Sequence, residues 1–159
     1  MGRMYPAAHR RFMQLPINDR LAVFSDILSF LECVASRKYV AIDFYDGSIM
    51  YDFANGKTTI CDIDLFHKQP CVNDMGRMWG SSRFQSPEEY QLGADIDEIT
   101  NVYTLGATAF ALFGEYNRTR EKWQLSDKLF EIATRAVSDD RTKRQQSIRQ
   151  FTAEWEAAQ

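Results

Sequence analysis

Residues 99–113, which read ITNVYTLGATAFALF, constrain this sequence more than any other feature. Nearly every position is apolar or small, and a helix that is hydrophobic all round must be enclosed by other elements. We therefore predict a central helix packed among other helices. The chain has 159 residues, and domains usually take roughly 100–200, so we expect a single domain over residues 1–159.

Amphipathic patterns predict further helices on both sides of this stretch. Apolar residues recur at three- or four-residue steps from Asn18 to near Ser36, with Asn18 or Asp19 available to cap the first turn. A second pattern covers residues 125–137 after the potential N-cap Ser126. The apolar positions of a last helix are Ile148, Phe151, Thr152 and Trp155.

A β-hairpin is predicted after the first helix. Short β-type stretches at residues 48–53 and 57–62 flank Ala54-Asn55-Gly56, and Asn-Gly between such stretches is a strong hairpin signal. Residues 65–97 show no sustained period, so we expect a long ordered loop, a feature usually associated with function. The predicted fold class is mainly α with a small β-hairpin.

Charge and hydropathy narrow the expected partners. The chain has 19 Lys and Arg against 22 Asp and Glu, a net charge of −3, so no global positive field attracts phosphate backbones or anionic lipid. We expect no nucleic-acid or membrane partner. No apolar run approaches the ~18 residues of a membrane span, and residues 1–6 lack the apolar core of a signal peptide. A cytoplasmic location is predicted.

The cysteines and histidines form no recognisable reactive cluster. Cys33, Cys61 and Cys71 are irregularly spaced, without a C-x-x-C pair or a His cluster that would indicate zinc. We predict reduced, mostly buried thiols. His9 and His67 belong to no catalytic arrangement that spacing can identify.

Several short motifs follow one another along the chain. They are Ala41-Ile42-Asp43-Phe44-Tyr45-Asp46-Gly47-Ser48, Asp62-Ile63-Asp64, Gly80-Ser81-Ser82-Arg83-Phe84-Gln85, Ser86-Pro87-Glu88 and Asn101-Val102-Tyr103-Thr104-Leu105-Gly106. In this order they resemble the H-R-D-x-x-x-x-N, D-F-G, G-T-x-x-Y-x-A-P-E and D-v-y-s-L-G segments of a protein kinase C-terminal lobe, of the bacterial Ser/Thr protein kinase-like type. The resemblance begins at about residue 17.

The resemblance divides the domain into four parts. Residues 1–16 are a lead-in, and residues 17–64 hold the first helix, the catalytic-type loop and the hairpin. Residues 65–97 correspond to an activation-type segment, and residues 98–159 to the helical base. The expected fold is therefore a kinase-like C-terminal lobe with the N-terminal lobe absent.

The resemblance implies ATP-dependent phosphoryl transfer to a protein hydroxyl with Mg²⁺. Asp43 would orient the attacking hydroxyl, and Tyr45 would supply a hydroxyl donor where the family has Lys. Asp62 and Ser48 would bind the nucleotide and its metal ion. Asp64 lies two residues beyond Asp62, so in extended backbone both carboxylates face one side, which favours a metal pair. Ser81 would belong to the substrate segment.

The resemblance also implies a structural ion pair. In the family the Glu of A-P-E pairs with an Arg before the last helix, and Asp139-Asp140-Arg141-Thr142-Lys143-Arg144 resembles the stretch that carries it. We predict that Glu88 pairs with Arg144 and holds the activation-type segment to the helical base.

Departures from the family leave alternatives open. The sequence contains no Gly-rich loop and no V-A-I-K strand. Ala41 and Ile42 replace the His and Arg of H-R-D, and Asn101 replaces an Asp. The chain could therefore be a C-lobe fragment inactive alone, a pseudokinase-like interaction module, or a relative of small-molecule phosphotransferases, whose D-x-D motif Asp62 and Asp64 resemble. Either the missing lobe or a partner protein would cover the exposed apolar face.

Overall fold

The computed structural model describes residues 7–159 and is mainly helical, with small antiparallel sheets. The helices are α1 (Ala7–Met13), α2 (Ile17–Ser36), α3 (Glu98–Phe113), α4 (Asp127–Ala136) and α5 (Ile148–Ala157). The strands are β1 (Tyr39–Val40), β2 (Ile49–Asp52), β3 (Lys57–Ile60), β4 (His67–Lys68), β5 (Cys71–Val72) and β6 (Asp95–Ile96). This confirms the coarse prediction of a mainly α fold with a small hairpin.

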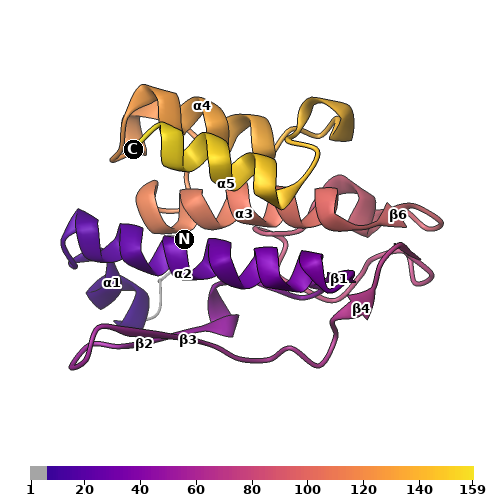
Figure 1. The fold of residues 1–159 in the computed structure, drawn as a ribbon, viewed down its shortest axis with the longest axis horizontal. Helices are drawn as coiled ribbons and strands as arrows, with labels where there is room; N and C mark the ends of the chain where they lie inside the picture. Colours follow the sequence, from indigo (N-terminus) through magenta and orange to yellow (C-terminus); the bar gives the residue numbers. More distant parts are fainter. Residues whose placement is uncertain (1–6) are drawn as a thin grey trace, which may run out of the picture.

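Helix α3 is the centre of the molecule, as its composition predicts. Every side chain from Thr100 to Phe113 is buried. Figure 1 shows α2 on one side of α3, with α4 and α5 covering the other. The packing against α4 depends on Gly106, because an added Cβ would lie 2.9 Å from the Ala133 carbonyl oxygen and 2.7 Å from the Ala136 Cβ. A small residue there allows the two helices to approach closely.

The helix boundaries agree with the sequence patterns, with one correction. Helix α4 is capped by Ser126, whose hydroxyl accepts a hydrogen bond from the Leu129 N–H. Helix α2 is not capped by Asn18 or Asp19 as predicted, because it begins earlier, at Ile17. Pro16 takes the cap position without a side-chain hydrogen bond. The first N–H groups of any helix lack an intrahelical partner, and at the start of α2 the cap residue offers no side chain that accepts a bond from them.

The hairpin is confirmed. Strands β2 and β3 are antiparallel, with Ile49 opposite Ile60 and Asp52 opposite Lys57. Gly56 has a φ of 64°, a left-handed conformation that glycine adopts at little cost. The hairpin lies below α2 in Figure 1.

Residues 65–97 form a structured segment with short pairings, although no pattern in the sequence predicts them. Strand β4 pairs with β1, and β5 pairs with β6. The buried Asn73 amide donates to the carbonyl oxygens of Gly76 and Glu88, at 2.6 and 3.1 Å. Side-chain to backbone bonds of this kind join distant parts of the segment in place of a regular sheet.

The predicted burial of the cysteines is wrong in part. All three thiols are free, Cys33 is exposed, and Cys61 and Cys71 are only half-buried. Cys33 lies on the outward side of α2, whose buried positions include Leu28, Leu31 and Ala35.

Among the helices within residues 7–159, none is both long and apolar enough to cross a membrane.

Candidate functional site

The catalytic-type loop starts beside α3 and is tied to it by Asn101. The Ala41 N–H donates to Asn101 Oδ1 at 2.7 Å, and Asn101 Nδ2 donates to the Ala41 carbonyl oxygen at 2.7 Å. Asn101 is buried, so these bonds replace the hydration of both groups. A carboxylate could accept the first bond but could not donate the second. The Asn that departs from the family pattern is therefore matched to both backbone groups of Ala41.

Asp43 and Asp62 come together although they lie on different segments. Ser48, at the end of the loop, accepts a hydrogen bond from the Cys61 N–H at 2.9 Å, which joins the loop to the end of the hairpin. Burial raises the pKa of Asp43, and the negative charge of Asp62 raises it further. The charge of Asp62 therefore acts on the carboxyl group of Asp43, and the bond between Cys61 and Ser48 holds the two segments side by side.

Both acids have left-handed backbone, with φ of 59° at Asp43 and 62° at Asp62. Residues other than glycine adopt this conformation at a cost, and such residues are concentrated at functional sites. Two such residues, one in the loop and one just after the hairpin, whose carboxyl groups interact electrostatically, mark this place as the candidate site.

The same backbone conformation corrects the argument for a metal pair at Asp62 and Asp64. Strand β3 ends at Ile60, and the left-handed Asp62 is followed by a turn at Asp64. The extended backbone that would place both carboxylates on one side is absent. Both side chains are exposed, and residues 7–159 hold no cluster of three or more His, Cys, Asp or Glu arranged to bind a metal ion.

Ser48 has a structural position within the loop. It is fully buried, its hydroxyl donates to the Asp43 carbonyl oxygen, and it accepts from the Tyr45 N–H, each at 3.5 Å. The hydroxyl is thus engaged within the loop, and its expected role as a metal ligand stays a prediction.

Tyr45 lies at the contact between this loop and the activation-type segment, and Ser81 lies within that segment. The Tyr45 ring covers Gly47, where an added Cβ would overlap with the ring. The same ring packs near Phe84, with centroids 6.5 Å apart. Ser81 is half-buried, and its carbonyl oxygen accepts hydrogen bonds from the N–H groups of Phe84 and Gln85.

Glu88 and Arg144, expected to pair, form a buried bidentate ion pair in the structure. Arg144 donates to the two carboxylate oxygens of Glu88 at 2.7 and 2.9 Å. Burial acts to raise the pKa of Glu88, but the hydrogen bonds and charge of Arg144 outweigh it, so the pKa is lowered. The pair joins the 3-10 helix Pro87–Tyr90 to the loop before α5.

Sequence reasoning missed two members of this network. Arg141 donates to both carboxylate oxygens of Asp97 at 2.8 Å and to Glu88 at 3.3 Å. Glu89 is buried, accepts hydrogen bonds from the Ser86 N–H and hydroxyl at 2.7 and 2.9 Å, and has its pKa raised to about 7 by burial. The spacing of Ser86 and Glu89, S-x-x-E, is a capping-box pattern that could have indicated the role of Glu89.

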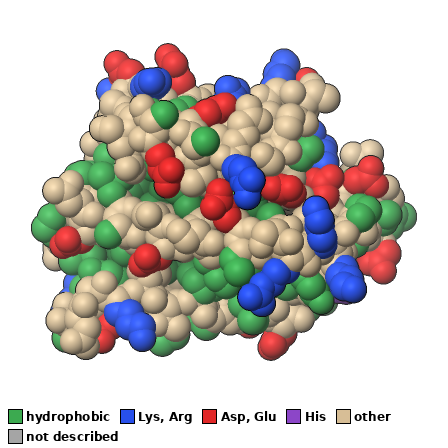
Figure 2. Space-filling model, viewed as in Figure 1, with side chains coloured by type: hydrophobic (Ala, Val, Ile, Leu, Met, Phe, Trp, Pro, Cys, Tyr) green, Lys and Arg blue, Asp and Glu red, His purple; other side chains and the backbone are tan. Residues whose placement is uncertain are grey.

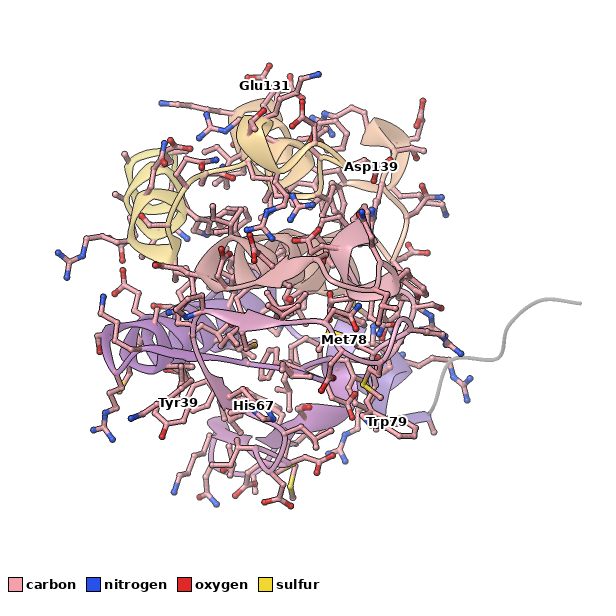
Figure 3. All side chains as sticks on the ribbon, turned by 90° about the vertical axis from the view of Figure 1, so that its right-hand side faces the viewer. Tyr39, His67, Met78, Trp79, Glu131 and Asp139 are labelled. Atoms are coloured by element: carbon pink, nitrogen blue, oxygen red, sulfur yellow. The ribbon has the colours of Figure 1, made fainter. Side chains whose placement is uncertain are left out.

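Figure 3 shows the side of the molecule on which the activation-type segment lies. Trp79 is on this side together with Met78, Tyr39 and His67, and Glu131 and Asp139 lie at the other end of the view. Met78 is buried, whereas the neighbouring Trp79 is 63% exposed.

In comparisons with known proteins, no family model matches this chain, and no curated protein matches it either.

Proposed function

We propose that this chain is the phosphoryl-transfer half of a kinase-like phosphotransferase acting on protein hydroxyls. The observation that carries the proposal is the meeting of Asp43 and Asp62. Two like charges held close together are stabilised by a cation, and Mg²⁺ is commonly bound by one or two carboxylates together with phosphate oxygens. The donor set therefore fits Mg²⁺ that arrives with ATP.

In this proposal the two acids have different tasks. Asp62 would hold the metal ion, which neutralises charge on the phosphates. Asp43 would accept a hydrogen bond from the attacking hydroxyl and orient it. Its raised pKa makes Asp43 a better acceptor for that proton. Asp64 stays a candidate second ligand, whereas we assign Ser48 to the internal bonding of the loop.

Binding is tested with Mn²⁺-ATP, because Mn²⁺ is a paramagnetic substitute for Mg²⁺. We expect the NMR signals of residues 43–48 and 61–64 to broaden as Mn²⁺-ATP is added. Asp62→Asn should abolish the effect, and Asp64→Asn shows whether the second acid contributes. Asp74→Asn, at an exposed acid in the activation-type segment, is the matched control and should broaden like the parent.

Absence of broadening in the parent, or equal broadening in Asp62→Asn, would overturn the proposal. Transfer of labelled phosphate is expected to be negligible in this chain, since the sequence contains no Gly-rich phosphate loop.

A non-catalytic interaction module is the second candidate, and the surface of the activation-type segment favours it. Its exposed apolar side chains are Val72, Met75, Trp79, Tyr90 and Leu92. Hydrogen bonds from Gly93 N–H to the Asn73 carbonyl and from Met78 N–H to the Glu89 carbonyl hold the two stretches of this surface together. Large exposed apolar surfaces are typical of interaction sites. If the parent shows no broadening in the Mn²⁺-ATP titration, the interaction module becomes the favoured function.

A further inference from the structure

Tyr116 follows α3 and reaches the far end of the catalytic-type loop. Its hydroxyl donates a hydrogen bond to the carboxylate of Asp46, the first residue of the 3-10 helix Asp46–Ser48. The φ of Tyr116 is 61°, and that of the preceding Glu115 is 53°. Two consecutive left-handed residues other than glycine are unfavourable and persist where the surrounding structure imposes them. The chain thus adopts a strained turn that brings Tyr116 to this loop.

The ring of Tyr116 is packed by groups from two other segments. The Arg83 guanidinium lies 4.6 Å from the ring centroid, and the His9 ring centroid lies 4.7 Å away. Phe84 makes an edge contact at 6.3 Å. Helix α1 and the activation-type segment therefore both hold the ring in place.

The contact at Asp46 is connected to Asp43 by short steps within the loop. The Ser48 N–H donates to the Tyr45 carbonyl oxygen at 2.9 Å, which closes the 3-10 turn. The Ser48 hydroxyl donates to the Asp43 carbonyl oxygen at 3.5 Å. Because Asn101 holds the start of the loop at Ala41, both ends are attached to α3 or to the residues directly after it.

We infer that Tyr116 is a positioning residue, which fixes the far end of the loop through Asp46 and so sets how Asp43 faces Asp62. The positioning role of Tyr116 rests on the proposed function, whereas the contact between Tyr116 and Asp46 can be tested independently of that function. Tyr116→Phe keeps the ring and its packing and removes only the hydroxyl.

The first measurement is amide hydrogen exchange at Ser48. We expect Tyr116→Phe to accelerate it roughly tenfold, the equivalent of one hydrogen bond, with exchange at Leu105 in the middle of α3 unchanged. Asp46→Ala should behave in the same way. Asp46→Asn keeps an acceptor for the Tyr116 hydroxyl and should restore the exchange of the parent.

Tyr90→Phe is the matched control, because it removes a hydroxyl that donates to Gln85 at 2.8 Å in the activation-type segment. Exchange at Ser48 should be that of the parent in this variant. Unchanged exchange at Ser48 in Tyr116→Phe overturns the inference.

The second measurement is the Mn²⁺-ATP titration. A positioning role predicts that Tyr116→Phe needs a several-fold higher concentration for half-maximal broadening, whereas Asp46→Asn and Tyr90→Phe titrate like the parent. If the parent responds to Mn²⁺-ATP and Tyr116→Phe reaches half-maximal broadening at the same concentration, the positioning role is overturned. If the parent does not respond, the proposed function fails, and exchange at Ser48 alone decides the role of Tyr116.

Discussion

At the scale of single residues, the adjacent buried carboxyl groups of Glu88 and Glu89 have opposite electrostatic environments. Glu88 is ionised against Arg144, so its pKa is lowered. Glu89 accepts hydrogen bonds from Ser86 without a directly bonded cation, and burial raises its pKa to about 7. One turn therefore holds a charge that stabilises the fold and a carboxyl group that is more stable when protonated.

Removing the carboxylate of Glu88 should destabilise the fold. The Arg144 side chain is completely buried, and Glu88→Ala would remove its bidentate partner. Loss of one partner of a buried pair typically costs about 3–5 kcal/mol, measurable by chemical denaturation. Glu131→Ala, at an exposed position of α4, should change the free energy of unfolding by less than about 0.5 kcal/mol. A Glu88→Ala variant that unfolds like the parent would contradict the structural role of the pair.

Glu89 should make stability depend on pH. Its pKa in the folded state, about 7, lies above the ordinary value of 4.5, so the folded state binds the proton more tightly. The resulting stability is fully present below pH 4.5 and is lost as the pH rises through 7. Each pKa unit corresponds to about 1.4 kcal/mol, so the total is on the order of 3 kcal/mol.

The measurement is the free energy of unfolding of the parent and of Glu89→Gln from pH 4.5 to 8. Gln keeps an acceptor for the two bonds from Ser86 and does not titrate. The parent should lose stability relative to Glu89→Gln across this range. A constant difference between the two proteins would show that Glu89 has an ordinary pKa.

At the scale of elements, the interface between α3 and the 41–48 loop depends on polar complementarity inside an apolar core. Phe44, in the middle of the loop, is buried and stacks with Phe30 of α2, with centroids 6.2 Å apart. Apolar packing of this kind does not depend strongly on the relative orientation of the side chains. The Asn101 amide, in contrast, satisfies two backbone groups in one orientation only. The amide therefore determines where the loop starts.

Asn101→Asp, which introduces the residue that the kinase motif has at this position, should destabilise this chain. The carboxylate would leave the Ala41 carbonyl oxygen without its donor and would add a buried charge, for a loss of about 1–3 kcal/mol or more in unfolding free energy. Asn117→Asp is the control, since the exposed Asn117 Oδ1 only accepts a bond from the Thr119 N–H and a carboxylate can do the same. Equal stability of Asn101→Asp and the parent at pH 7 would refute the assignment.

At the scale of the whole molecule, one main core joins residues from α1 to α5. It contains Phe24, Phe113, Phe151, Trp123 and Trp155, whose rings contact one another at 4.7–6.4 Å. Figure 2 shows acidic and basic side chains interspersed on the face viewed in Figure 1. Their mixing fits the small net charge of −3.

Because the helices share this core, we expect the chain to unfold in a single cooperative transition. Trp123 and Trp155 are buried in the core, whereas Trp79 is exposed. In a Trp79→Phe variant, tryptophan fluorescence therefore reports on the core alone, and its denaturation midpoint should coincide with that of far-UV circular dichroism. Separate midpoints would mean that part of the chain unfolds independently of the core.

The sequence by itself determined helices α2 to α5, the hairpin and the central position of α3, whereas helix α1 lies in the stretch that we expected to be a lead-in. These features depend on local periodicity, as with residues 99–113, or on local turn chemistry, as with Asn55-Gly56. The buried pairing of Glu88 with Arg144 was also accessible, through a family resemblance in the order of motifs.

Only the tertiary structure decided the geometry of the candidate site. The left-handed backbone at Asp62, the inward hydroxyl of Ser48, and the contacts of Arg141 and Tyr116 depend on which distant groups the chain brings together. A sequence pattern records spacing along one segment, and these features are set by hydrogen bonds between segments that only the folded core places side by side.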